Sequence, residues 1–167
     1  KKLQYFDSEL GKNYVPYVVE TSIGLDRMFL AVLSKSLMHE TLEDGSQRTV
    51  LKLPAFLAPN KVAILPLLKK DGLPEKAREV TESLKLNHIV QYDEKDAIGK
   101  RYRRQDAAGT PLCVTVDHKS LEDNTVTVRF RDTMEQIRIP LSKLTAITNE
   151  TVSLNAQFGK LSSFIDI

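Results

Sequence analysis

Residues 62–84 read VAILPLLKKDGLPEKAREVTESL, and this stretch decides the fold class. The run at 62–67 is continuously apolar, which is typical of a strand buried on both faces. The Asp71-Gly72 pair predicts a turn, and Pro74 suits the first turn of a helix. Apolar residues then recur at helical spacing, at Leu73, Ala77, Val80 and Leu84. A buried strand that leads into an amphipathic helix predicts an α/β domain.

The same alternation continues downstream. A second strand is predicted at 88–92, a short basic helix at 98–108 with Gly109 closing it, and a third buried strand at 112–116. Two crossover helices make these three strands mutually parallel, because such connections are right-handed and return to the same sheet.

Residues 125–130 and 136–139 alternate apolar and polar side chains, and five residues separate them, which predicts a hairpin. Pro140 ends this hairpin, and the spacing of Leu141, Leu144 and Ile147 predicts a last helix. The expected fold is therefore a five-stranded mixed β-sheet flanked by about three helices.

The N-terminal part has a different pattern. Residues 14–20 carry a β-branched and aromatic strand signal, Gly24 breaks it, and a helix with one apolar face is predicted from Leu25 to about His39. The polar stretch after it, with Pro54 and Pro59 beyond, predicts a connection. The expected organisation is the C-terminal end of a first domain at 1–40, a linker at 41–57, a second domain at 58–151 and a C-terminal tail at 152–167.

Composition limits the function. Apolar residues make up 41% of the chain and the formal net charge is only +2, so a nucleic-acid site must be a local patch. Cys113 is the single cysteine, which excludes an internal disulfide and fits a cytoplasmic protein. The chain does not begin with Met, and we expect it to be a piece of a longer protein.

Metal and phosphate-loop motifs are missing from the sequence. The three histidines, His39, His88 and His118, show no metal-ligand spacing, and we expect no metal site. There is no Walker loop and no Gly-x-Gly-x-x-Gly. The pair Asp117-His118 lacks a nucleophile, so a polar strand end is favoured over part of a catalytic triad.

The segment from Glu20 to Arg27 is the first candidate site. Glu20 and Ser22 are two apart in an extended stretch, so their side chains share a face and could hold an ammonium group. Arg27 lies in the first helical turn, where a guanidinium could clamp a phosphate or stack on a base. The alternative is that the acidic residues cap the helix and pair with Arg27.

Two further candidates are basic. Residues 99–106 combine four cations with Tyr102 on a short helix, which suits phosphate contact and base stacking, or else forms a solvated charged face. In the hairpin, one face carries Thr127, three arginines and Gln136. This face is either a candidate nucleic-acid surface or an exposed sheet edge that charge protects from pairing. The candidate cations on the helix and the hairpin are Arg101, Arg103, Arg104, Arg129, Arg131 and Arg138.

Together these stretches resemble class II glycyl-tRNA synthetases. The pattern Glu20-x-Ser22-x-Gly24-x-Asp26-Arg27 is similar to motif 3 of class II enzymes, although Thr21 stands where that family often has proline. The similarity continues through 53–73, 98–106, 109–117 and 121–136, with the residues around the basic helix and the hairpin being the most specific part. The resemblance covers about residues 3–150.

The resemblance implies that residues 1–40 are a strand–helix remnant of an antiparallel catalytic domain and that 58–151 bind an anticodon. It implies an enzyme that uses ATP and Mg²⁺ to ligate glycine to glycine tRNA through glycyl-adenylate, as a cytoplasmic homodimer. Arg27 would be the catalytic, ATP-binding residue, and Glu20 and Ser22 would bind glycine. The six candidate arginines would contact tRNA. Motifs 1 and 2 would lie upstream, so this chain alone is expected to be inactive and to hold no cofactor.

Two alternatives stay open. One is a non-catalytic nucleic-acid-binding accessory module with the same fold, which need not retain an arginine at position 27. The other is a sibling class II synthetase for proline, threonine or histidine. The Glu20-x-Ser22 pattern and the Arg104-Gln105-Asp106 stretch favour the glycyl enzyme.

Overall fold

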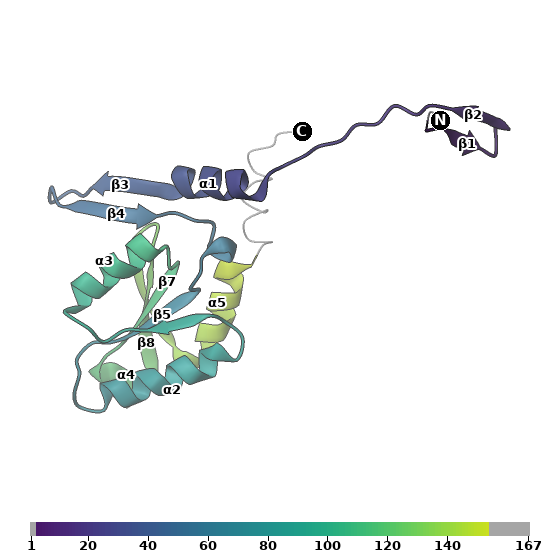
Figure 1. The fold of residues 1–167 in the computed structure, drawn as a ribbon. Coiled ribbons are helices and arrows are strands. Elements are labelled where there is room, and N and C mark those ends of the chain that lie inside the picture. Colours follow the sequence, from purple (N-terminus) through teal and green to yellow (C-terminus); the bar gives the residue numbers. More distant parts are fainter. Residues whose placement is uncertain (1–2, 154–167) are drawn as a thin grey trace. The chain divides into compact units, whose positions relative to one another are not determined.

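A computed structural model describes residues 3–153 of the chain (Figure 1). It divides into two compact units, with the division between Ala31 and Val32. The expected tail at 152–167 lies outside the described residues from position 154 onward. Among residues 3–153, no helix is long and apolar enough to cross a membrane.

The first unit contains a small hairpin and the start of a helix. Strands β1 (Tyr5–Asp7) and β2 (Lys12–Tyr14) pair antiparallel, and α1 (Leu25–Ser36) follows after a stretch without regular structure. The strand predicted at 14–20 is therefore wrong beyond Tyr14. A strand needs a neighbour for its backbone hydrogen bonds, and Val15–Gly24 pair with no strand within the described residues.

A second hairpin occupies the expected linker. Helix α1 ends at Ser36, three residues earlier than predicted, and β3 (Leu37–Thr41) pairs antiparallel with β4 (Gln47–Leu51). The Asp44-Gly45 turn connects them, with Gly45 at a φ of 78°. Arg48 and Val50 are both buried, whereas Gln47 before them and Thr49 between them are exposed. This alternation gives β4 a buried face and makes the hairpin part of the packed structure.

The main sheet has five strands in the order β6-β5-β7-β8-β9. Its strands are β5 (Val62–Pro66), β6 (Val90–Tyr92), β7 (Leu112–Val116), β8 (Thr125–Phe130) and β9 (Gln136–Pro140). β5 pairs parallel with β6 and β7, while β7–β8 and β8–β9 are antiparallel. The predicted mixed sheet is confirmed.

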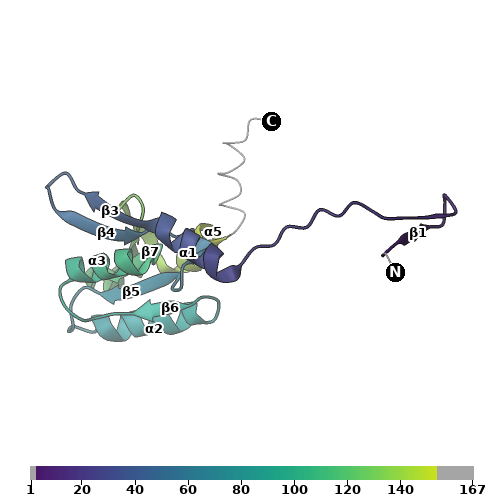
Figure 2. The same ribbon diagram turned by 45° about the horizontal axis from the view of Figure 1, so that its top comes forward.

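Helices cover both faces of this sheet (Figures 1 and 2). The helices of the second unit are α2 (Leu73–Lys85), α3 (Ile98–Ala108), α4 (His118–Asp123) and α5 (Leu144–Val152), besides short 3-10 turns at Ala55–Leu57 and Leu141–Lys143. Val62 and Ile64 pack with α2 and α5 in the larger apolar core. Ala63 and Leu65 face the opposite way, toward Ile98 and Tyr102 of α3. The α3 side therefore holds the smaller apolar cluster.

Gly109 fixes the junction between α3 and β7. It has a φ of 80° and caps α3, with its N–H donating to carbonyl oxygens of Gln105 and Asp106. A Cβ there would lie 3.0 Å from the carbonyl oxygen of Leu51 and 3.3 Å from its Cδ2. Glycine is required both by the left-handed backbone and by the close approach of β4.

We expect Gly109→Ala to destabilise the chain more than Gly45→Ala. Both substitutions place alanine at positive φ, at a cost of about 1–2 kcal/mol each. A Cβ at Gly45 meets no atom within 4 Å, so the control lacks the clash with Leu51. Urea unfolding should show an additional loss of about 1–3 kcal/mol for Gly109→Ala. Equal losses would mean that β4 does not pack against Gly109 in solution.

Candidate nucleic-acid interface

A buried carboxylate on α3 holds an arginine of β8 and an arginine of β4. Asp106 on α3 is 0% exposed. Arg129 Nη1 and Nη2 donate to its Oδ1 and Oδ2 at 2.7 and 3.0 Å. Arg48 Nη1 lies 3.5 Å from Oδ2 and also donates to the carbonyl oxygen of Arg131 at 3.1 Å. One carboxylate therefore joins α3, β8 and β4.

Two further arginines are buried against backbone carbonyl groups. Arg131 Nη1 donates to the carbonyl oxygens of Leu51 and Gly109, and its Nη2 donates to that of Leu53. Arg101 donates to the carbonyl oxygens of Pro66 and Leu67, at the end of β5. Arg101 and Arg131 are 2% and 3% exposed, so these guanidinium groups tie segments of the fold together.

These contacts correct one expectation. The hairpin register is as predicted, with Thr127 opposite Arg138 and Arg129 opposite Gln136. However, Arg101, Arg129 and Arg131 do not form an open positive surface, because their side chains are enclosed and their donors are directed to internal acceptors.

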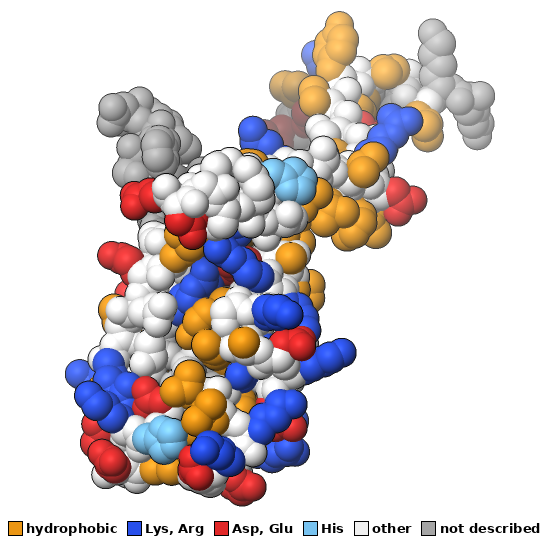
Figure 3. All heavy atoms as spheres, turned by 90° about the vertical axis from the view of Figure 1, so that its left-hand side faces the viewer, with side chains coloured by type: hydrophobic (Ala, Val, Ile, Leu, Met, Phe, Trp, Pro, Cys, Tyr) orange, Lys and Arg blue, Asp and Glu red, His pale blue; other side chains and the backbone are white. Residues whose placement is uncertain are grey.

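The remaining candidate arginines lie at the surface. Arg104 Nε donates to Asp93 at 3.0 Å, and its other nitrogens contact Asp96. Arg138 forms two 2.8 Å hydrogen bonds with the carboxylate of Asp117. Figure 3 shows this mixture, with Asp and Glu side chains beside several Lys and Arg side chains on the face in view.

Arg103 differs from the other five. It is half-buried on α3, and within residues 3–153 it has no hydrogen bond or ion pair. Its neighbour Lys100 is exposed and likewise has no such partner among the described residues. Arg103 interacts electrostatically with the exposed Asp44, but its guanidinium has no hydrogen bond or ion pair in the described chain and can also bind an external anion.

Polar side chains lie where α3 meets the sheet and on the strands beside α3. Tyr102 donates or accepts a 2.6 Å hydrogen bond with Thr115, and the Arg129 guanidinium lies 4.9 Å above the Tyr102 ring. Across the strands from Arg129 lies Gln136, which is exposed. We call Tyr102, Thr115, Thr127, Arg129, Gln136 and Arg138 the polar face. Its half-buried aromatic ring and exposed amide suit base stacking and hydrogen bonding.

The motif at Glu20–Arg27 is less organised than the polar face. Glu20, Ser22 and Arg27 are all exposed, and no hydrogen bond or ion pair joins them in the described chain. Arg27 lies in the first turn of α1, as predicted. The structure does not bring the three side chains together into a pocket.

Arg48 and its link to Asp106 were missed by the sequence analysis. Arg48 lies in the stretch that was interpreted as a polar linker, and it is 58 residues from Asp106. The available signal was the β-branched pair Thr49-Val50 followed by Leu51, which comes shortly after the Asp44-Gly45 turn.

We expect Asp106→Asn to lower the free energy of unfolding by about 3–5 kcal/mol, because it leaves Arg129 buried without its carboxylate and removes one of the two carboxylates beside the buried Arg48. The control is Asp96→Asn, whose side chain is 38% exposed and pairs with Arg104, which is 41% exposed. That change should cost about 0–1 kcal/mol. Urea unfolding compares the two variants, and similar losses would contradict the structural role of Asp106.

Asp117 gives the chain a pH-dependent stability. The hydrogen bond from Arg138 lowers the pKa of Asp117 from 3.8 to about 2, despite partial burial, which acts in the opposite direction. Between these values the unfolded chain binds more protons than the folded chain, so the contribution is present above about pH 4 and is lost as pH falls through 2.

Asp117→Asn should therefore destabilise the protein by on the order of 1 kcal/mol at pH 6, and by less at pH 2.5. Asparagine keeps an N-cap acceptor for α4, so the change mainly removes the charge. The measurement is urea unfolding at both pH values. A stability difference that stays constant would show that Arg138 does not perturb this carboxyl group.

A family of known proteins matches the part of the chain that contains the five-stranded sheet. The family model described as "Anticodon binding domain" matches residues 61–151. A solved structure, the RNA binding domain of threonyl-tRNA synthetase from Cryptosporidium parvum Iowa II, is similar with a TM-score of 0.55 and 24% identity, over 60% of this chain and 25% of that one. At this identity the likeness concerns the fold alone.

Curated relatives named glycine–tRNA ligase are more similar in sequence. The chain is 54% identical over 144 residues to that of Borrelia hermsii (strain HS1 / DAH), covering 86% of this chain and 32% of the relative. It is 51% identical over 148 residues to that of Macrococcus caseolyticus (strain JCSC5402), covering 89% and 32%. The chain thus spans about a third of the length of these relatives. Since the family model covers the whole five-stranded sheet with its helices, the chain belongs to the anticodon binding domain family.

Proposed function

We propose that this chain is part of a class II glycyl-tRNA synthetase and that its second unit binds the anticodon of glycine tRNA. The similarity to glycine–tRNA ligases supports the glycyl enzyme, because it extends well beyond the matched domain into the N-terminal segment. The observation that carries the binding role is the polar face, whose Gln136 and Arg138 are exposed and whose Tyr102 and Thr127 are half-buried, while α2 and α5 cover the opposite face.

The whole protein would ligate glycine to its tRNA with ATP and Mg²⁺ as a cytoplasmic homodimer. Arg27 would contact ATP, and Glu20 with Ser22 would hold the ammonium group of glycine. These side chains bind and orient charged groups, so their contribution would be positioning and charge stabilisation. Their exposure in this chain fits a site that further segments of the enzyme complete.

On the polar face, an unstacked base would lie against Tyr102 and Gln136. The ring of Tyr102 offers a stacking surface, and the Arg129 guanidinium fixes the ring from one side. The two anticodon bases common to glycine tRNAs are cytosines, whose Watson–Crick edge has one amino donor beside two acceptors. The amide of Gln136 supplies an acceptor and donors for that edge.

The arginines would then have separate roles. Arg103, which is unpaired within the described chain, would contact a phosphate, with Lys100 beside it on α3. Arg129 would hold the Tyr102 ring in place by lying over it, while its own charge is paired with Asp106. Arg104 and Arg138 would contribute from surface ion pairs, and Arg101 and Arg131 would hold the backbone of the site in place.

We expect Gln136→Ala and Arg103→Gln to affect RNA binding differently. The measurement is fluorescence anisotropy with a glycine tRNA and with a version in which both anticodon cytosines are changed. Gln136→Ala should lose about 1–3 kcal/mol for glycine tRNA, and little for the changed RNA. Arg103→Gln should weaken both RNAs alike and reduce the slope of log affinity against log salt by about 1.

The matched control is Lys143→Gln, an exposed cation beside α5 on the opposite face of the sheet. It should leave both affinities unchanged. If Gln136→Ala weakens both RNAs equally, Gln136 does not recognise a base. If none of the variants changes affinity, RNA binds elsewhere on the chain.

A further inference from the structure

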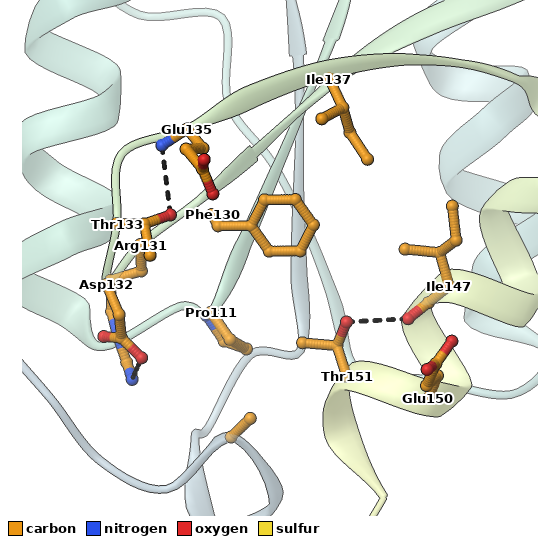
Figure 4. A pocket seen from close by; sticks show the side chains of 11 residues that line it. Pro111, Phe130, Arg131, Asp132, Thr133, Glu135, Ile137, Ile147, Glu150 and Thr151 are labelled. Atoms are coloured by element: carbon orange, nitrogen blue, oxygen red, sulfur yellow. Dashed lines mark hydrogen bonds and ion pairs between the residues drawn. The ribbon is translucent and has the colours of Figure 1, made fainter. Parts of the chain in front are cut away.

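A second surface lies on the other side of the same hairpin. A cavity of about 490 Å³ opens between the β8–β9 turn, the last turns of α5 and the segment at Ala55 (Figure 4). Phe130 and Ile137 contribute to it from β8 and β9, and Ile147 contributes from α5. Because strand residues alternate, these side chains point away from the face that carries Arg129 and Gln136.

The floor of this cavity is apolar and its rim is acidic. Pro111, Phe130, Ile137 and Ile147 line the floor, and the carboxyl groups of Asp132, Glu135 and Glu150 surround it (Figure 4). Ile137 is 41% exposed, so part of the floor meets solvent.

Two of the three carboxylates at the rim have no cationic partner in the part of the chain that the structure describes. Asp132 pairs with Arg131, which also lines the cavity but directs its other donors to backbone carbonyl groups. The carboxylates of Glu135 and Glu150 have no hydrogen bond or ion pair in the part of the chain that the structure describes. The cavity is therefore negative at its mouth, with two carboxylates free to accept a partner's cation.

We propose that this cavity is a docking site for a protein segment that inserts an apolar side chain flanked by lysine or arginine. A polyanion such as RNA is disfavoured, because the unpaired carboxylates would repel its phosphates. An apolar side chain that covers Phe130 and Ile137 removes apolar surface from water, which favours binding. The basic residues that flank it complement the charges of Glu135 and Glu150. This inference is independent of the proposed anticodon site, which lies on the opposite face of the hairpin.

The test uses the full chain with ¹³C-labelled isoleucine methyl groups and two peptides. The first is acetyl-Gly-Lys-Phe-Lys-Gly-amide, and the matched control replaces both lysines with glutamates. We expect the lysine peptide to shift the methyl resonances of Ile137 and Ile147 saturably at low salt, and the glutamate peptide to leave them in place. Added salt should weaken the binding, because the rim charges are exposed.

A double variant, Glu135→Gln with Glu150→Gln, should bind the lysine peptide about fivefold more weakly, as expected for the loss of two exposed ion pairs. Glu82→Gln with Glu122→Gln, which removes two exposed carboxylates elsewhere, should bind like the original chain. Equal binding of both peptides, no shift with the lysine peptide, or an unaffected double variant would each overturn the proposal. So would an anticodon stem-loop RNA that shifts the same two resonances.

Discussion

The carboxylate of Asp106 is the point on which the α3 side of the molecule depends. It accepts two hydrogen bonds from Arg129 and lies 3.5 Å from Arg48, and it is fully buried. Helix α3 supplies few apolar contacts to the sheet, mainly through Ile98 and Tyr102. The helix is therefore held largely by polar groups, in contrast to α2, whose inner face is aliphatic.

A polar attachment of this kind fixes geometry more than it adds stability. Burying charges carries a desolvation cost that their mutual attraction only partly offsets, and removing one partner is strongly destabilising. In this protein, the buried ion pairs fix the positions of side chains and of β4. Asp106 orients Arg129 over the ring of Tyr102, and Arg48 brings β4 against α3. The hairpin β3–β4 consequently belongs to the same unit as the sheet, rather than to a flexible connection.

The parts of the fold that were predictable are those with local signals. The limits of α3 and β7 follow from periodicity and from Gly109, and the parallel direction of β5, β6 and β7 follows from two crossover helices. Partner choice over long distances was not predictable. The ion pair between Arg129 and Asp106 spans 23 residues and that of Arg48 spans 58, and no local pattern reveals either. Of the six arginines that the helix and hairpin patterns assigned to RNA, Arg101, Arg129 and Arg131 have guanidinium groups that are enclosed by internal acceptors.

The alternation of side chains along β8 and β9 explains how one hairpin can present two unlike surfaces. Arg129 and Gln136 point to the α3 side, where the buried Arg129 pairs with the carboxylate of Asp106. Phe130 and Ile137 point to the other side, where unpaired carboxylates surround an apolar floor. A shift of the β8–β9 register by one residue would exchange these faces and place arginines in the apolar core. The same packing that buries Val126 and Val128 thus determines which face would bind RNA and which face would repel it. Under the two proposals, two partners of opposite charge could occupy the hairpin at once without competing for a side chain.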